Sequence, residues 1–550
     1  MLAKKCNNKI EFSIFVSAMV MILLCLSPAK PTTLAWQAIS TPQLRSTSIL
    51  GPSTPASLTP SSSDPSMKEL PLVQNNSEPL GIALDGFGNV WFAENNPSAI
   101  VEYNPLTQDF STFLIPFSGS SMIWFMLFDD RGILWFANAL QPFLWSFSPV
   151  THEFSNFSTG NPLVDPYSLA YYAATQQIWF TSIYTDQIGS FQIAGNGATL
   201  VHLINVTGTA RAGTFGPKFG PSGITIDSQG NVYVSETFSG EIAEYSQSDQ
   251  RFVNLWYLPV GSEPVGIALD SGNHRVWFTN HATSLFGYVD QNTGQVTEYA
   301  TSLFSYLGNN ITLPYWIQLS SNGTVWFDEH EANKMARFDP STGQLTEFLI
   351  PTSQSAPLRF VIDDTRNVIW LTEFFGNKLG ELDTNSSCGC SVQLSEDNLT
   401  LTGGTTSMLL KYTNATDFGL INPEVNGPLI SGSLSTSGFL SANLSISSER
   451  LNSSYYKITL GSGSSLVPGN YSITICPSES VLDNVTNPPP VRQCAVAHLY
   501  VAQSKTGSES LTKIFAISVI GTALLASLLI VRKKRLASQD SKLRKSSRAS

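Results

Sequence analysis

Short hydrophobic runs alternate with polar turns throughout residues 67–384. In the first unit, this pattern predicts four antiparallel strands at Leu80–Leu84, Val90–Glu94, Ile100–Tyr103 and Phe110–Ile115. The turns between them contain Asp, Asn, Gly and Pro, whose side-chain hydrogen bonds and dihedral preferences favour chain reversal. The second strand is apolar at consecutive positions, which is typical of a sheet that is covered on both faces. The pattern therefore predicts small sheets packed against one another.

The same unit recurs along the chain. A phrase with a blade-opening proline, a Gly-Ile pair, an aspartate, a Gly/Asn turn and Val-Trp-Phe-x-Glu can be followed through seven copies, whose aromatic residue falls at Trp91, Trp135, Trp179, Tyr233, Trp277, Trp326 and Trp370. Successive spacings are 44, 44, 54, 44, 49 and 44 residues. A period of roughly 40–50 residues with several short strands per unit is the signature of a β-propeller. The repeat therefore predicts an all-β, seven-bladed propeller over residues 67–384.

The first strand of the domain is expected to close the ring. The segment Met67–Leu72 resembles the fourth strands at Ser111–Ile115 and Thr346–Ile350. The last repeat stops near Asp383 after three strands. The N-terminal segment can therefore supply the missing strand of the seventh blade and cover its open edge.

Both ends of the chain predict a membrane-anchored surface protein. Residues 1–29 have the pattern of a signal peptide, with an uncleaved anchor as the alternative, and residues 30–66 form a Ser/Thr/Pro-rich disordered linker. Residues 513–531 contain an uncharged run of 18 residues, Ile514–Val531, followed by a basic tail at 532–550. This arrangement predicts a single transmembrane helix in the lipid bilayer, an extracellular ectodomain and a cytoplasmic C-terminus.

Charge narrows the range of partners. The tail carries +7 and residues 1–30 carry +3, so the chain's net charge of −11 leaves −21 for residues 31–531. An acidic exterior argues against nucleic acid, whose phosphates require a basic surface. The chain contains twelve Asn-x-Ser/Thr sequons, and seven of them are crowded between Asn385 and Asn484, which predicts a glycoprotein. The expected partner is an unidentified extracellular ligand, which could be a small molecule, a glycan or a protein.

Residues 388–503 differ in composition from the repeats and predict an immunoglobulin-like β-sandwich. Tryptophan disappears, and Pro468-Gly469-Asn470-Tyr471 resembles the entry to a late strand of such sandwiches. Four cysteines occur here, Cys388, Cys390, Cys476 and Cys494, and an even number outside the cell favours disulfides. Either Cys388 and Cys390 each pair elsewhere, or Cys476 pairs with Cys494. A metal cluster is a weaker alternative.

The blade phrase itself resembles a known family. Pro79–Asp85 with Asn89–Glu94, Glu331–Arg337 and Gly376–Gly380 are similar to the blade signature of the streptogramin (virginiamycin B) lyases. The resemblance covers residues 67–384 and implies an enzyme that opens the lactone ring of its antibiotic by elimination, with magnesium and histidines. In that family the histidines follow the blade-opening proline of the last two blades, and a glutamate closes the second strand of the final blade.

Position by position, the catalytic part of this resemblance fails. The two histidine slots hold Tyr315 and Leu358, and only Glu373 stands near the glutamate position. Because leucine neither accepts a proton nor binds a cation, the family's mechanism cannot operate unaltered. Glu373 and Tyr315 are the remaining catalytic candidates.

Polar residues at the blade ends suggest a binding site on one rim of the channel. The start of the first strand lies beside the end of the second in each antiparallel hairpin. Glu329, His330 and His281 are the predicted ligands of a divalent cation, magnesium or calcium. Glu94, Glu236, Asp328 and Tyr167 are predicted to line the rest of the rim. The alternative is that these residues only end their strands at a solvated face.

The sequence therefore favours a membrane-anchored ligand-binding or surface-interaction protein. One alternative is a divalent-metal-dependent lyase or lactonase acting at the channel rim. The other is a structural cell-envelope protein whose propeller is a spacer. Turnover of a cyclic ester, saturable binding without turnover, or neither would distinguish these three functions.

Overall fold

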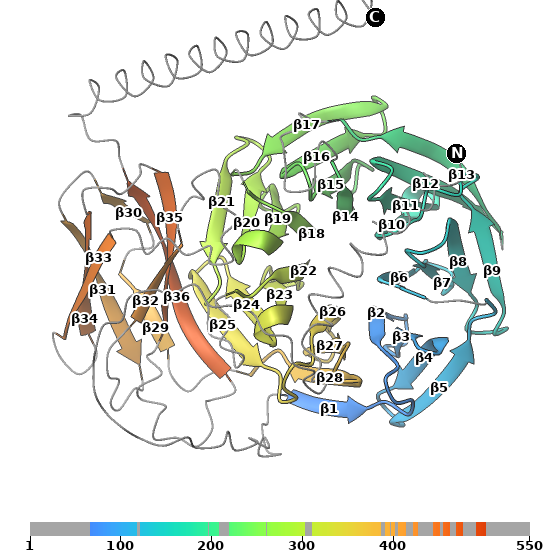
Figure 1. The fold of residues 1–550 in the computed structure, drawn as a ribbon, viewed down its shortest axis with the longest axis horizontal. Helices are drawn as coiled ribbons and strands as arrows, with labels where there is room; N and C mark the ends of the chain where they lie inside the picture. The colour runs from blue at the N-terminus through green and yellow to red at the C-terminus, as the bar shows by residue number, and fades with distance from the viewer. Residues whose placement is uncertain are drawn as a thin grey trace, which may run out of the picture. The chain divides into compact units, whose positions relative to one another are not determined.

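The computed structural model describes residues 67–117, 121–195, 197–207, 219–259, 261–302, 311–386, 391–395, 398–401, 405–413, 422–426, 444–450, 455–462, 469–476 and 491–501. Within them the chain is built from β-strands and three short 3-10 turns. Figure 1 shows seven sheets arranged around a common axis, from the blue first strands to the yellow-orange seventh blade. The predicted seven-bladed propeller is confirmed.

Each of the first three blades is a four-stranded antiparallel sheet with its strands in sequence order. The first blade contains β2 (Pro79–Leu84), β3 (Val90–Asn95), β4 (Ser98–Asn104) and β5 (Asp109–Leu114). The second contains β6 (Phe125–Phe128), β7 (Leu134–Ala137), β8 (Phe143–Phe147) and β9 (Phe154–Ser158). The third contains β10 (Leu169–Tyr172), β11 (Gln177–Ser182), β12 (Gln187–Ala194) and β13 (Gly197–Asn205).

The following three blades repeat the arrangement. The fourth contains β14 (Pro221–Ile226), β15 (Val232–Glu236), β16 (Glu241–Ser246) and β17 (Arg251–Tyr257). The fifth contains β18 (Pro264–Asp270), β19 (Arg275–Asn280), β20 (Leu285–Asp290) and β21 (Val296–Ala300). The sixth contains β22 (Pro314–Leu319), β23 (Val325–Glu329), β24 (Lys334–Asp339) and β25 (Gln344–Leu349).

The seventh blade combines strands from both ends of the propeller. It contains β26 (Pro357–Asp363), β27 (Val368–Glu373) and β28 (Lys378–Asp383), and β1 (Met67–Pro71) pairs antiparallel with β28. Lys378 Nζ also forms an ion pair with Glu69 on β1. The predicted closure of the ring by the N-terminal strand is confirmed.

The aspartate of the repeat holds the turn and the following tryptophan together. In the first blade, Oδ1 of Asp85 accepts hydrogen bonds from the backbone N–H groups of Phe87 and Asn89, both at 2.9 Å. Its Oδ2 accepts from Trp91 Nε1 at 3.0 Å. This single carboxylate therefore satisfies both turn donors and the indole N–H of a tryptophan that is 1% exposed.

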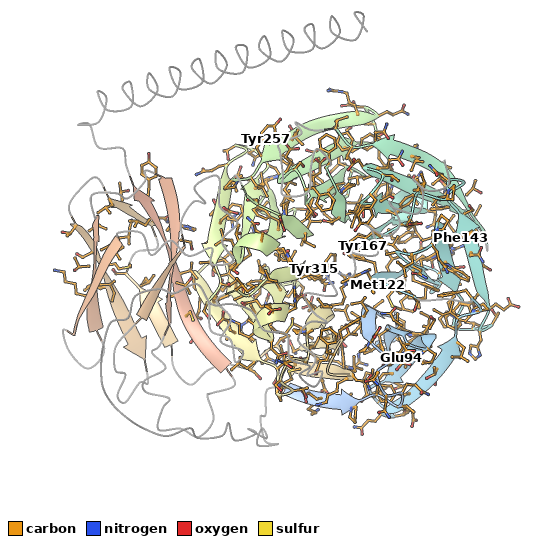
Figure 2. The ribbon with its side chains drawn as sticks, in the orientation of Figure 1. Glu94, Met122, Phe143, Tyr167, Tyr257 and Tyr315 are labelled. Atoms are coloured by element: carbon orange, nitrogen blue, oxygen red, sulfur yellow. The ribbon has the colours of Figure 1, made fainter. Side chains whose placement is uncertain are left out.

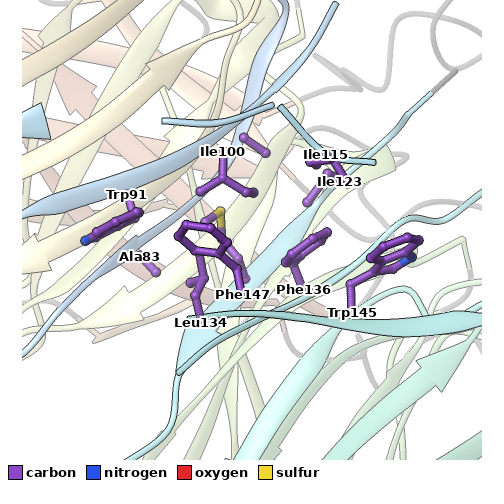
Figure 3. Close-up of a cluster of buried hydrophobic side chains, with 11 residues drawn as sticks. Ala83, Trp91, Ile100, Ile115, Ile123, Leu134, Phe136, Trp145 and Phe147 are labelled. Atoms are coloured by element: carbon purple, nitrogen blue, oxygen red, sulfur yellow. The ribbon is translucent and has the colours of Figure 1, made fainter. Parts of the chain in front are cut away.

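Tryptophan and phenylalanine rings fill the space between neighbouring blades. Figure 3 shows the cluster between the first and second blades, in which Trp91 and Ile100 pack with Phe136, Trp145 and Phe147. All five side chains are at most 5% exposed. Burial of such large apolar surfaces is the main stabilising contribution to a propeller, because each blade covers both faces of its sheet with its neighbours.

Close approach of the first strands explains the repeated glycine. A Cβ atom added to Gly266 on β18 would lie 2.5 Å from the carbonyl oxygen of Tyr315 on β22 of the next blade. The hydroxyl of Thr279 donates to that same carbonyl at 2.7 Å. Glycine and a hydroxyl residue thus join consecutive blades close to the axis.

Strands after the propeller form further sheet structure. A four-stranded sheet contains β29 (Ser391–Leu394), β31 (Thr405–Thr413), β34 (Tyr455–Ser462) and β33 (Leu444–Arg450). A second group contains β30 (Asn398–Leu401), β32 (Asn422–Asn426), β35 (Gly469–Cys476) and β36 (Val491–Val501), of which β36 pairs antiparallel with β25 of the sixth blade. An immunoglobulin-like sandwich stays a prediction, since much of 388–503 lies outside the described residues.

The cysteine prediction is tested only at one position. Cys494 is fully buried in the core beside the sixth blade and is disulfide-bonded. Cys388 and Cys390 lie outside the described residues, as do the predicted signal peptide, linker, transmembrane segment 513–531 and tail. Among the helical segments that the structure describes, none has the length and apolar character needed to span a membrane.

Candidate functional site

Aromatic side chains from three blades meet at the axis of the propeller. Tyr167 precedes the first strand of the third blade, Tyr315 lies on β22 of the sixth, and their hydroxyl groups share a hydrogen bond. The ring of Trp124 lies 5.4 Å from that of Tyr315, and the ring of Phe125 lies 5.3 Å from that of Tyr167, measured between centroids. Figure 2 shows Tyr167 and Tyr315 near the centre of the ring of blades. Together with Trp316, these residues form what we call the axial aromatic cluster.

Burial keeps both tyrosines protonated. Removal from water raises the pKa of Tyr167 to about 12, although its bond with Tyr315 and the charge of Arg359 oppose the rise. Burial also raises the pKa of Tyr315 well above its usual range. Neither phenol can therefore act as a base at neutral pH, and both are available as hydrogen-bond donors or acceptors.

An arginine lies within the axial aromatic cluster. The Cζ atom of Arg359, on β26, is 3.6 Å from the ring centroid of Trp316 and 3.7 Å from that of Phe125. Arg359 is 4% exposed, and its buried Nε and Nη1 atoms have no hydrogen-bond partner within the described part of the chain. Burial lowers the pKa of Arg359 to about 10, so the guanidinium remains charged at neutral pH. The buried guanidinium of Arg359 therefore has two nitrogen atoms whose N–H groups lack a hydrogen-bond partner among the described residues.

An aspartate replaces the usual hydroxyl residue of the blade in the same region. Thr181, Ser235, Thr279 and Thr372 occupy the position in the third, fourth, fifth and seventh blades, and each donates to a backbone carbonyl of the next blade at 2.7 Å. In the sixth blade this position is Asp328. Its Oδ2 accepts from the backbone N–H of Trp316 at 3.0 Å, whereas its buried Oδ1 has no hydrogen-bond partner among the described residues. Burial raises the pKa of Asp328 well above its usual range, and Arg359 opposes this rise.

Two histidines from adjacent blades lie near Tyr315 with their Nε2 atoms directed at each other. His281 opens a 3-10 turn (His281–Thr283) after β19, and His330 opens the equivalent turn (His330–Ala332) after β23. Their Nε2 atoms are 3.2 Å apart. Each imidazole centroid lies about 6 Å from the ring centroid of Tyr315, at 6.0 Å for His281 and 6.1 Å for His330. The structure therefore brings together two of the three residues predicted to bind a cation.

Both imidazoles are neutral at physiological pH. Burial lowers the pKa of His281 to about 4. The pKa of His330 lies well below its usual range because of burial and, secondarily, the neighbouring His281. His330 is 7% exposed, and its Nδ1 has no hydrogen-bond partner within the described part of the chain.

Glu329, the third predicted cation ligand, is held by a lysine. Lys334 Nζ lies 3.2 Å from Glu329 Oε2 and 2.9 Å from Glu347 Oε1, and all three side chains are at most 1% exposed. Burial raises the pKa of Glu329 to about 8, and Lys334 opposes this rise. Among the described residues, no group of three His, Cys, Asp or Glu side chains could hold a metal ion.

The remaining carboxylates of the predicted rim are buried within their blades. Glu94, Glu236 and Glu373 are 2% exposed or less, so the interpretation that they end their strands at a solvated face is wrong. Glu236 Oε2 accepts from Ser239 Oγ at 3.0 Å, and burial followed by the neighbouring Glu241 raises its pKa. The pKa of Glu373 is raised well above its usual range by burial and Glu69, and Lys378 opposes this rise. A role of these residues in ligand binding or catalysis stays a prediction.

Sequence reasoning missed Arg359 and Trp316, although the repeat contained a signal for both. The third residue of the blade-opening phrase is glycine at Gly81, Gly223 and Gly266, where neighbouring strands approach closely. The sixth and seventh blades place Trp316 and Arg359 at this same position. A bulky or charged residue in a position that holds glycine in three other blades indicates that the axis is lined differently there.

Comparisons with known proteins agree with the propeller. Residues 196–391 match the model of the Virginiamycin B lyase family, which is less than half of the chain. A streptogramin B lyase structure is similar, with a TM-score of 0.50 and 20% identity over 57% of this chain and 96% of that one. A catalytically inactive virginiamycin B lyase from Staphylococcus aureus with quinupristin is also similar, with a TM-score of 0.50 and 21% identity over 58% and 98%. The search of curated proteins finds no match.

These similarities are at the level of the fold. The magnesium chemistry that the family resemblance implies requires histidines at the slots of Tyr315 and Leu358. In the structure these slots hold a fully buried phenol and a leucine that is 3% exposed. The residues present do not fit that metal, and no catalytic step through it can be derived from this chain.

Proposed function

We propose that the propeller is a ligand-binding module that takes a small anionic molecule, such as a carboxylic acid, at the axial aromatic cluster. The observation that carries this proposal is the buried guanidinium of Arg359 with two unpaired N–H groups. An unpaired buried charge is costly, and a bound anion would compensate it. Charged hydrogen bonds of this kind are also stronger than those between neutral groups.

The neighbouring groups support a ligand with a second polar atom. The buried Oδ1 of Asp328 has no hydrogen-bond partner among the described residues and offers a further polar contact to such a ligand. Trp316 Nε1 is buried without a hydrogen-bond partner among the described residues and provides another donor. A few convergent polar groups surrounded by aromatic rings are the usual composition of a small-molecule site. This favours a small molecule over a glycan or a protein as the ligand.

We further propose that this module is displayed outside the cell. The signal-peptide pattern at 1–29, the apolar run Ile514–Val531 with its basic flank, and the crowded sequons support a glycosylated, single-pass membrane protein. Protease added to intact cells is expected to remove the propeller and leave a fragment with the tail. Detection of an intact, protease-resistant propeller would contradict this location.

Binding is tested with a panel of carboxylic acids, each paired with its uncharged amide. The full chain should be thermally stabilised by at least one acid and not by its amide, because only the acid neutralises Arg359. Arg359→Met should abolish this stabilisation. Arg275→Met is a matched control, since Arg275 also lies over an aromatic ring, with its Cζ atom 4.3 Å from the ring centroid of Tyr288, but at the start of β19 in the fifth blade. Stabilisation that persists in Arg359→Met would contradict the proposal.

A metal-dependent lyase or lactonase is the second candidate, and the paired imidazoles of His281 and His330 favour it. Turnover of a cyclic ester by the parent protein, with loss of activity in His330→Ala, would support the enzyme. If neither saturable binding nor turnover is observed, the result would favour the third function, in which the propeller is a structural part of the cell envelope.

A further inference from the structure

We infer that His281 and His330 are two ligands of a site for a divalent transition metal of the zinc, nickel and copper type. This site is built from the second-strand ends of the fifth and sixth blades. It is distinct from the anion site at Arg359, although both sites use the sixth blade and lie on either side of Tyr315.

The separation of the two donors suits a shared metal. Tetrahedral zinc binds imidazole nitrogen at about 2.0–2.1 Å, which places two nitrogens of the same ion roughly 3.3 Å apart. The observed distance between the Nε2 atoms of His281 and His330 is 3.2 Å. A metal could therefore be accommodated between the two imidazoles with small movements of either ring.

The chemistry of the donors selects the kind of metal. Imidazole nitrogen is a good ligand for zinc, nickel and copper, whereas magnesium and calcium prefer oxygen. The two Nε2 atoms that face each other are the donor atoms available to such a metal. Glu329, the oxygen donor next to His330, is ion-paired with Lys334 and does not enter the pair. We therefore propose a metal that prefers nitrogen ligands, in place of the magnesium or calcium ion that the sequence led us to expect.

The two imidazoles differ in their exposure to solvent. His281 is half-buried, so the pair is reachable from solvent, whereas His330 is 7% exposed. Water or a bound molecule would supply the other ligands, since the pair offers one protein ligand fewer than the three of a catalytic zinc site. Without metal, a single proton shared between the two Nε2 atoms would hold the rings together as a hydrogen bond. The two arrangements can be distinguished by whether added metal raises the melting temperature of the protein.

The test uses the full chain, freed of metal and titrated with Zn²⁺, Cu²⁺ or Mg²⁺ alone. Zn²⁺ is expected to raise the melting temperature, and a 100-fold excess of Mg²⁺ is expected neither to reproduce nor to prevent this rise. His281→Asn and His330→Asn should each abolish it. His274→Asn is the matched control, because His274 is an exposed turn residue with a φ of 54° that asparagine also adopts. Arg359→Met should keep the zinc response, which separates this site from the anion site.

A spectroscopic measurement keeps the inference testable if a histidine variant fails to fold. Electron paramagnetic resonance of one equivalent of Cu²⁺ on the parent protein should show coupling to two imidazole nitrogens. Absence of that coupling, absence of a zinc response in the parent, or a response that survives both folded histidine variants would each overturn the assignment. Stabilisation by Mg²⁺ equal to that by Zn²⁺ would overturn the proposed metal class.

Discussion

The hydroxyl groups of Tyr167 and Tyr315 form a hydrogen bond across the axis of the propeller, between the third and the sixth blade. Tyr315 occupies one of the two slots where the streptogramin lyase resemblance requires a histidine. Its phenol is fully buried and its pKa is raised by desolvation, so it cannot replace an imidazole as a base. The bond instead joins the third blade to the sixth, next to the rings of Trp124 and Phe125.

Lys334 is expected to be a major contributor to stability. Its substitution by methionine leaves Glu329 and Glu347 buried without their cation, which should cost about 3–5 kcal/mol of the free energy of unfolding. Lys68→Met is the matched control, because Lys68 pairs with Glu381 at 3.0 Å but its side chain is 70% exposed. That control should change stability by less than about 1 kcal/mol. Equal effects in urea unfolding of the two variants would contradict the assignment of a buried ion-pair network.

In the absence of ligand, replacing Arg359 is expected not to lower the stability of the fold, in contrast to replacing Lys334. Arg359→Met removes a buried charge whose Nε and Nη1 lack partners among the described residues, while keeping an apolar side chain between Phe125 and Trp316. Replacing a buried charge by a hydrophobic residue of similar volume is often neutral or stabilising. The variant is therefore expected to melt at or above the temperature of the parent. A loss of more than about 3 kcal/mol would show that the guanidinium is a structural group.

The repeat made the fold predictable because every blade is formed by contacts between residues that are close in the sequence. The aspartate, the turn and the tryptophan are consecutive in the sequence, and their hydrogen bonds are made within one hairpin, as at Asp85 and Trp91. The closing strand was predictable for the same reason, since Met67–Pro71 has the composition of a fourth strand. Local periodicity therefore specified the blades and their number.

The candidate site was less predictable because it depends on contacts between blades. The proximity of His281 and His330 followed from their equivalent positions in adjacent blades. The ion pair of Glu329 with Lys334 required the pairing of β23 with β24, and it changed the role expected for Glu329. Arg359 contacts Phe125 and Trp316, and these three residues come from three different blades. Such contacts between distant parts of the chain cannot be seen in a local sequence pattern.

Removal of the closing strand should destabilise the whole propeller. Deleting residues 67–73 leaves β28 without its antiparallel partner and Lys378 without Glu69. We expect aggregation or a loss of several kcal/mol, because the exposed edge can pair with other chains. A deletion of equal length at residues 53–59, outside the strand, serves as the control. Equal melting temperatures for the two deletions would contradict the role of β1 in closure.

Because of Glu236, the free energy of unfolding is expected to depend on pH in the parent protein more than in Glu236→Gln. Burial and the neighbouring Glu241 raise the pKa of Glu236 to about 8, from an ordinary value of 4.5. The folded state then holds a proton that the unfolded state releases, so this group destabilises the fold increasingly as the pH rises from about 5 to about 8. Glu236→Gln, which is neutral at every pH, should remove that dependence.

The measurement is the free energy of unfolding of the parent and of Glu236→Gln in urea at pH 5, 6.5 and 8. The variant's stability relative to the parent should increase with pH, by at most about 1.4 kcal/mol per pH unit. Glu153→Gln is a suitable control, because Glu153 is an exposed residue whose substitution should leave a pH-independent offset. A difference that stays constant between pH 5 and pH 8 would mean that Glu236 is ionised in the folded protein, and that its pair with Glu241 is held by another charge.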